Sequence, residues 1–243
     1  MKIFRQLKNT VVIIIALTWT LCCGLMGILM MLFLWDGRKV QYINARYLWS
    51  PLVCSVCGIN VKVSGVENID QNKATIYIAN HSSYLDILAV SRIMPTGLFY
   101  VGKKELGWIP VLGLYMWVVG HFFVDRKNHS AAMNSMRKGA KKILKGRSII
   151  VFAEGTRSSD GHLGKFKRGA FIIAKEGMID VAPIAIQGAH ELLPKKSFML
   201  KSGKIDVKFG ARIAGEEIKN YSETELADFT RKKVIELMNP DNP

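Results

Sequence analysis

The chain has 243 residues and carries 34 Lys and Arg against 19 Asp and Glu, a formal net charge of +15. This length allows one sizeable core in one or two domains, and the positive charge suits an anionic partner, either nucleic acid or a membrane surface. Nucleic acid is disfavoured because the basic residues lack interleaved aromatic residues and no recognition motif occurs. We therefore expect a lipid surface, and no nucleic acid, as the anionic partner.

The N-terminal segment is strongly apolar. Thr10 to Trp35 is uncharged over 26 residues, more than the roughly 20 residues that cross a bilayer core, and no signal-peptide cleavage site follows it. A second apolar stretch, Tyr42 to Gly58, predicts a second helix. We expect residues 1–58 to form a two-helix membrane anchor and residues 59–243 to form the main folded domain.

Basic residues lie on both sides of the first apolar segment, with Lys2, Arg5 and Lys8 before it and Arg38, Lys39 and Arg46 after it. The positive-inside tendency favours the cytoplasmic side for both flanks. A single straight span cannot satisfy this tendency, whereas a hairpin that dips into one leaflet can. The length of the segment also permits the alternative, one true span with the N-terminus outside.

Beyond residue 58, short apolar runs alternate with helix-forming stretches. The apolar runs predict strands near 60–66, 74–79, 98–102, 121–124, 148–153, 181–186 and 204–209. The helix-forming stretches predict helices near 83–93, 129–145, 168–176 and 222–238. This alternation indicates an α/β fold with a mixed, largely parallel sheet flanked by helices. The apolar stretch 106–124 is broken by glycines and Pro110, which favours an interior or interfacial element over a membrane span.

A histidine and an aspartate lie five residues apart in the segment Asn-His-Ser-Ser-Tyr-Leu-Asp, at 80–86. His81 follows a predicted strand, and Asp86 lies about one turn into the next helix. Ligands of α/β sheets bind beyond the carboxyl ends of the strands. A carboxylate that holds the imidazole there would make His81 a competent general base. The same spacing also fits a turn histidine that merely meets a helix-capping aspartate.

Three further blocks follow predicted strands or form them: Gly-His-Phe-Phe-Val-Asp-Arg at 120–126, Phe-Ala-Glu-Gly-Thr-Arg-Ser at 152–158, and Val-Ala-Pro-Ile-Ala-Ile at 181–186. Together with the block at 80–86, and in this order, they resemble the glycerolipid acyltransferase family, specifically its bacterial 1-acylglycerol-3-phosphate acyltransferases. The resemblance covers roughly residues 60–210. The block at 181–186 matches more loosely, because the family often has further prolines there.

The block at 154–157 has the chemistry of an anion site. Gly155 permits a tight turn, Thr156 offers a hydroxyl donor, and Arg157 presents a planar fork that can bind a phosphate through two hydrogen bonds. The resemblance implies that Glu154-Gly155-Thr156-Arg157 binds the glycerol phosphate of an acceptor and that Lys103 is another phosphate contact. It also implies catalytic roles for His81 and Asp86. The role of Glu154 within its block stays open.

The expected reaction is transfer of a fatty acyl group from acyl-CoA or acyl-carrier protein to the sn-2 hydroxyl of lysophosphatidic acid, giving phosphatidic acid. Glycerol-3-phosphate or another lysophospholipid is the alternative acceptor, and a non-catalytic anionic-lipid-binding protein is the alternative class. Acyl donors are cytosolic, so we expect the inner membrane with the catalytic domain facing the cytoplasm. The sequence sets neither the acyl-chain length, the donor nor the oligomeric state.

No cofactor and no metal are expected. A thiolate is a good leaving group, so the reaction needs neither, and no His-Glu-x2-His spacing occurs. Cys54 and Cys57 form a Cys-x2-Cys pair, but no second pair or histidine cluster completes a zinc site. Their apolar surroundings favour buried structural thiols of a reducing compartment.

Overall fold

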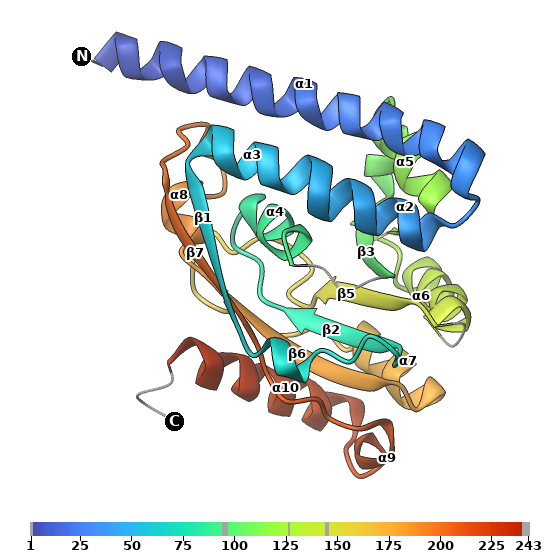
Figure 1. The fold of residues 1–243 in the computed structure, drawn as a ribbon. Coiled ribbons are helices and arrows are strands. Elements are labelled where there is room, and N and C mark those ends of the chain that lie inside the picture. The colour runs from blue at the N-terminus through green and yellow to red at the C-terminus, as the bar shows by residue number, and fades with distance from the viewer. Residues whose placement is uncertain (1, 94–96, 126, 144–145, 240–243) are drawn as a thin grey trace.

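The computed structural model describes residues 2–93, 97–125, 127–143 and 146–239, and a seven-stranded sheet forms its centre (Figure 1). The strands are β1 (Ile59–Ser64), β2 (Thr75–Ala79), β3 (Leu98–Lys103), β4 (Phe122–Val124), β5 (Ser148–Phe152), β6 (Asp180–Gln187) and β7 (Gly203–Phe209). Their order in space is β1-β7-β6-β2-β5-β3-β4. Strands β2 to β6 run parallel, whereas β7 is antiparallel to β6 and parallel to β1. The predicted strands and the mixed, largely parallel sheet are confirmed.

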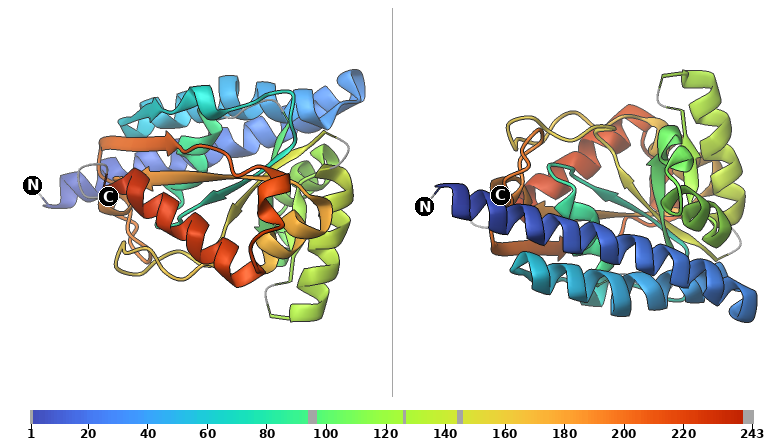
Figure 2. Two further views of the ribbon diagram at one scale, coloured as in Figure 1. Left: turned by 90° about the horizontal axis from the view of Figure 1, so that it is seen from below. Right: turned by 90° about the horizontal axis from the view of Figure 1, so that it is seen from above.

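Helices cover both faces of this sheet (Figures 1 and 2). One core lies under α3 (Ser50–Cys57) and α4 (Leu85–Ser91), and the other lies under α6 (His129–Ile143), α7 (Gly169–Gly177) and α10 (Glu223–Met238). Strand β2 contributes to both cores because its side chains alternate, with Tyr77 in the first and Ile76 and Ile78 in the second. The four predicted helices beyond residue 58 are confirmed, and the described residues also form the short helices η2 (Val66–Asn68), η3 (Lys104–Trp108), α5 (Leu112–Val119), α8 (Ala189–Leu192) and α9 (Gly215–Ile218).

The N-terminal segment forms an antiparallel pair of helical stretches. Helix α1 (Lys2–Leu34) runs along a continuous helical stretch made of α2 (Gly37–Ile43), the π-helical η1 (Asn44–Trp49) and α3 (Figure 1). Among the described helices, α1 is the one long and apolar enough to cross a membrane. The second stretch belongs to the sheet's cover, because Cys54 and Cys57 of α3 are buried in the first core. Burial raises the pKa of Cys57 to about 11, so its thiol stays protonated.

The apolar stretch 106–124 folds as η3 (Lys104–Trp108), α5 (Leu112–Val119) and β4. Helix α5 has eight residues, too few to cross a bilayer. It packs against α1 and α2, and it buries Val119 on one side while Trp117 on the other is 72% exposed. The breakers in this stretch therefore mark a short surface helix.

A buried histidine joins the N-terminal helices to the sheet. His121 accepts a hydrogen bond from the backbone N–H of Tyr100 through Nδ1 (3.0 Å), and its Nε2 lies 3.1 Å from Oε1 of Gln41 on α2. The hydroxyl of Tyr115 on α5 donates to the same oxygen (2.6 Å). Burial and, to a smaller extent, the nearby Arg147 lower the pKa of His121 to about 3, so the ring is neutral.

Candidate active site

The predicted site residues gather at one edge of the sheet because their strands are parallel. His81 and Asp86 follow β2, and the block at 154–157 follows the neighbouring strand β5. The two loops contact each other through the backbone, where the N–H of Ser158 donates to the carbonyl of His81 (2.8 Å). The crevice beyond the carboxyl ends of β2 and β5 is therefore the candidate active site.

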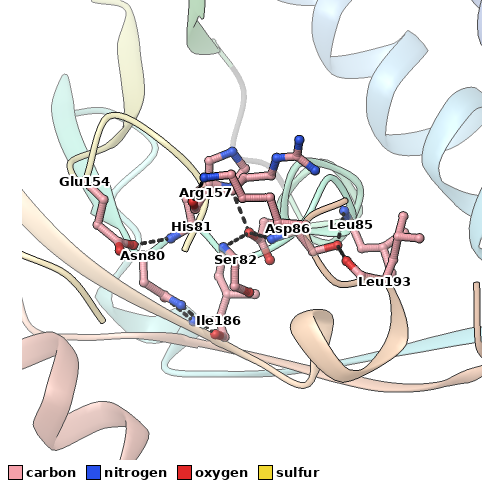
Figure 3. A network of polar contacts seen from close by, with 11 residues as sticks. Asn80, His81, Ser82, Leu85, Asp86, Glu154, Arg157, Ile186 and Leu193 are labelled. Carbon is pink, nitrogen blue, oxygen red and sulfur yellow. Dashed lines mark hydrogen bonds and ion pairs between the residues drawn. The ribbon is translucent and has the colours of Figure 1, made fainter. Parts of the chain in front are cut away.

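His81 and Asp86 form a close pair (Figure 3), with 2.8 Å between Nδ1 and Oδ2. Asp86 is fully buried, and the same oxygen accepts the backbone N–H groups of Ser82 (2.7 Å) and Ser83 (2.8 Å). An ionised carboxylate can only accept, so it holds His81 in the tautomer that carries its proton on Nδ1. The lone pair of Nε2 then has no hydrogen-bond partner among the described residues. This is the state that a general base needs.

One face of the His81 ring also packs against an aromatic side chain. It stacks on Phe152, the last residue of β5, with the ring centroids 4.1 Å apart and the planes 20° apart. Stacking and the bond to Asp86 together leave the side chain only 11% exposed. The imidazole is thus oriented before any substrate binds.

Asn80, next to His81, ties the loop to a third strand. Its side-chain amide donates to the carbonyl of Ile186 and accepts the N–H of the same residue, both at 2.8 Å (Figure 3). Asn80 is buried. This pair of hydrogen bonds makes the end of β6 part of the support of the catalytic loop, a contact that the sequence alone does not predict.

Glu154 links the two site loops. Its carboxylate accepts the backbone N–H of His81 (2.7 Å) through one oxygen and that of Gly164 (2.9 Å) through the other. Burial raises the pKa of this carboxyl, and the two backbone hydrogen bonds oppose the rise. Both oxygens thus accept backbone N–H groups, so Glu154 holds the loop of His81 against the loop after β5, and its contact with substrate stays a prediction.

The remaining residues of the block have the conformation and charge of an anion site. Gly155 has a φ of 72°, the left-handed conformation that the tight turn requires. The guanidinium of Arg157 lies over the ring of Tyr84, with Cζ 3.7 Å from the centroid. The ammonium of Lys195 donates to the carbonyl of Arg157 (2.6 Å) and lies 3.3 Å from the hydroxyl of Thr156.

Two cavities adjoin these residues. The first has a volume of about 460 Å³ and is lined mostly by polar residues, which include the cationic Arg157, Lys165 and Lys195 and the acidic Glu154 and Asp160. The second has a volume of about 600 Å³ and is mainly apolar, with Phe152, Met133, Met136 and Phe166 on its wall. Phe152, which stacks on the His81 ring, lines the apolar cavity, and Glu154, which accepts the backbone N–H of His81, lines the other one.

Lys103 pairs with a residue outside the predicted site. It ends β3 at the same edge of the sheet, but its ammonium pairs with Glu105 (3.0 Å). In the block at 120–126, Arg126 lies outside the described residues, and Asp125 lies 3.6 Å from the ammonium of Lys104. Neither Lys195 nor Tyr84 could be identified from the sequence, because Lys195 lies beyond the matched blocks and Tyr84 is an ordinary position between His81 and Asp86.

No group of His, Cys, Asp and Glu side chains that could hold a metal ion occurs within the described residues. The site holds a positioned imidazole with its carboxylate, beside cationic and hydroxyl groups.

Comparison with known proteins supports this description. The family model named Acyltransferase matches residues 60–187. A 1-acyl-sn-glycerol-3-phosphate acyltransferase of Saccharomyces cerevisiae is 31% identical over 97% of this chain and 78% of the relative, and one of Limnanthes douglasii is 34% identical over 82% and 69%. The crystal structure of the 1-acyl-sn-glycerophosphate (LPA) acyltransferase PlsC from Thermotoga maritima superposes with a TM-score of 0.81 and 26% identity, over 98% of this chain and 97% of that one.

Proposed function

Because the chain belongs to the acyltransferase family, we propose that it transfers a fatty acyl group to the sn-2 hydroxyl of 1-acylglycerol-3-phosphate, lysophosphatidic acid. The product is phosphatidic acid, an intermediate of phospholipid synthesis. The names of its relatives and of the similar solved structure support this reaction. The observation that carries the proposal is the His81–Asp86 pair, which leaves Nε2 of His81 free and whose loop contacts the loop of Arg157.

In the proposed mechanism, Nε2 of His81 takes the proton of the acceptor hydroxyl while the hydroxyl oxygen attacks the carbonyl carbon of the thioester. Asp86 offsets the charge that the imidazole gains. The tetrahedral intermediate then collapses, the carbon–sulfur bond breaks, and the leaving thiolate takes the proton from His81. General-base catalysis of this kind typically contributes about 10²- to 10⁴-fold in rate.

The phosphate of the acceptor is proposed to bind at Thr156 and Arg157, on the wall of the polar cavity. An arginine can bind two phosphate oxygens at once, which orients the glycerol as well as attracting it. Lys103 remains a proposed second contact, and reaching the phosphate would require it to leave Glu105. Glu154 would support the site indirectly, through the backbone of His81.

The acyl donor is proposed to be acyl-CoA or acyl-carrier protein, with no metal and no redox cofactor. Both donors are soluble and cytosolic, so the active site would face the cytoplasm at the inner membrane. The exposed apolar face of α1, which includes Leu17, Leu25 and Leu32, supports membrane attachment. Transfer at a membrane surface would give the enzyme direct access to an acceptor that lies within the lipid layer.

A panel of substrates tests the proposal. The purified protein in mixed micelles is given radiolabelled acyl-CoA or acyl-carrier protein together with lysophosphatidic acid, glycerol-3-phosphate or another lysophospholipid. We expect labelled phosphatidic acid from lysophosphatidic acid, and nearly none when His81→Ala replaces the wild type. Faster turnover of glycerol-3-phosphate or of another lysophospholipid would assign a different acceptor. Binding of anionic vesicles without any turnover would make the protein a lipid-binding module.

A further inference from the structure

One contact between the side chains of the two site loops involves a tyrosine that no sequence pattern singles out. Tyr84 immediately precedes α4, within the segment from His81 to Asp86. Its ring lies 3.7 Å from Cζ of Arg157, which belongs to the loop after β5. This is the distance of direct stacking, within the range of a cation–π contact.

The backbone of Arg157 is held from two sides, but its side chain is not. Lys195 donates to the Arg157 carbonyl (2.6 Å), and the N–H of the next residue, Ser158, donates to the His81 carbonyl (2.8 Å). Among the described residues, the Arg157 guanidinium donates no hydrogen bond and forms no ion pair. The ring of Tyr84 is therefore the contact that sets the plane of the guanidinium.

This kind of contact leaves the guanidinium free to bind an anion. The N–H donors of arginine lie in the plane of the group, and an aromatic ring occupies only one of its faces. Two donors can still meet two phosphate oxygens at the edge. A guanidinium whose plane is already set also loses less conformational freedom when the phosphate binds, and this raises affinity.

We propose that Tyr84 is a positioning residue for the acceptor: its ring holds Arg157 in the orientation that binds the phosphate monoester. The inference rests on the proposed function, since it concerns the same phosphate. Tyr84 acts through Arg157 and not on the reacting atoms. It therefore affects how tightly the acceptor binds and leaves the chemical step unchanged.

Tyr84 is suited to substitution. Its side chain is 62% exposed, its backbone is helical, and it forms no side-chain cap at the start of α4. Two variants separate the ring from the apolar bulk: Tyr84→Phe keeps the π face, and Tyr84→Leu keeps apolar volume without it. Neither changes the charge of the site, so a difference between them reports on the stacking itself.

Steady-state kinetics at saturating acyl donor provide the test. Tyr84→Leu should raise the KM for lysophosphatidic acid about two- to tenfold, the range for one cation–π contact, with kcat, donor KM and melting temperature unchanged. Tyr84→Phe should keep the wild-type acceptor KM. Arg157→Ala should itself raise that KM about ten- to a hundredfold, and adding Tyr84→Leu to it should have no further effect.

Several results would overturn the proposal: an unchanged acceptor KM in Tyr84→Leu, an equal rise in Tyr84→Phe, or the same effect of Tyr84→Leu with and without Arg157. A rise that accompanies weaker flotation with anionic vesicles would assign the ring to membrane contact instead. Failure of the proposed function is a separate result, in which the wild type makes no phosphatidic acid. Binding of lysophosphatidic acid to His81→Ala, with and without Tyr84→Leu, then measures the contact without turnover, and equal affinities would overturn it.

Discussion

Asn80 and Ile186 lie 106 residues apart in the chain and are joined by two hydrogen bonds of 2.8 Å each. The side-chain amide of Asn80 takes the place of a strand residue, because it satisfies both backbone groups of Ile186 at the end of β6. Buried backbone groups need such partners. The pair therefore stabilises the fold and fixes the loop that begins at His81.

Asn80→Ala should lower both stability and activity. Removing the amide leaves two buried backbone groups of Ile186 without a partner, which should reduce the free energy of unfolding by about 2–4 kcal/mol. The freed loop should also misplace His81 and lower kcat about ten- to a hundredfold. Denaturant unfolding and turnover of lysophosphatidic acid measure the two effects.

Asn9 offers a matched control for this variant. Its amide makes the same kind of paired contact, donating to the carbonyl of Phe198 (2.7 Å) and accepting the N–H of Leu200 (2.9 Å), at a half-buried position outside the site loops. Asn9→Ala should therefore leave kcat near the wild-type value. A kcat that falls equally in the two variants would contradict a specific role for Asn80 in placing His81.

The second prediction concerns the catalytic pair. His81→Ala should lower kcat by about 10²- to 10⁴-fold, since it removes the general base. Asp86→Asn should lose most activity as well, because a neutral amide no longer stabilises the imidazolium. Turnover measured alongside circular dichroism and melting temperature checks both variants.

The structure adds a constraint on how Asp86→Asn should fold. Oδ2 of Asp86 accepts two backbone N–H groups besides the His81 ring, and Oδ1 is buried without a hydrogen-bond partner among the described residues. The amide oxygen can replace Oδ2, so the fold should survive. A folded Asp86→Asn protein with near-normal kcat would show that the pair is structural.

Much of the fold follows from local patterns in the sequence. The central strands are apolar runs bounded by polar residues, as in 75–79, whereas β1 and β7 alternate apolar and polar residues; both patterns can be recognised in the sequence alone. Helix α5 cannot be recognised in this way, because Gly113 and the preceding Pro110 are typical of a break between secondary-structure elements. In the structure Gly113 allows the backbone of α5 to approach that of η3 closely, since a Cβ at Gly113 would lie 2.3 Å from the carbonyl oxygen of Gly107. The glycine allows close packing here, and a local sequence pattern cannot distinguish this from a glycine that ends a helix.

The site was predictable to the extent that its residues are close in sequence or follow neighbouring strands. His81 and Asp86 lie on one loop, and the block at 154–157 meets them because β5 pairs with β2. The stacking of Arg157 on Tyr84 and the bonds from Lys195 depend on how separate loops meet in space. Lys103 shares the sheet edge, but its side chain has a nearer partner in Glu105.

The third prediction is a dependence of stability on pH that arises from His121. Its pKa is about 3 in the folded protein and near 6.5 in the unfolded chain. Between these values the unfolded chain binds a proton that the folded protein does not. The stability is therefore fully present above about pH 6.5 and falls as the pH is lowered, by up to about 1.4 kcal/mol per pH unit from this group.

His121→Asn isolates this effect from the titration of carboxylates. Asparagine can still accept the N–H of Tyr100 at the position of Nδ1, but it does not titrate. The variant should be less stable near neutral pH, because the contact with Gln41 is lost, and its stability should depend less steeply on pH between about 4 and 6.5. Unfolding curves in detergent over this range measure the slope, and equal slopes for the two proteins would rule out His121 as the source.

The last prediction concerns the attachment to the membrane, and it depends on how α1 is held. Contacts connect α1 to the rest of the chain along its length: Asn9 to Leu200 near its start, the indole N–H of Trp19 to the carbonyl of Leu48 (3.0 Å), and the carbonyl of Cys23 to the amide of Asn44 (2.6 Å). The opposite face of α1 is apolar and exposed. These contacts favour an α1 that lies along the protein, with its exposed face in one leaflet.

A spanning α1 would have to give up these contacts, since a helix perpendicular to the membrane cannot follow α2 and α3. We therefore expect both ends of the chain on the cytoplasmic side, in agreement with the basic residues that flank α1. Separate tags on the N-terminus and on Pro243, probed with protease from outside the cell, measure this. Both tags should be protected. An N-terminal tag that is cleaved from outside would establish a spanning α1, and a cleaved C-terminal tag would place the active site on the wrong side for a cytosolic donor.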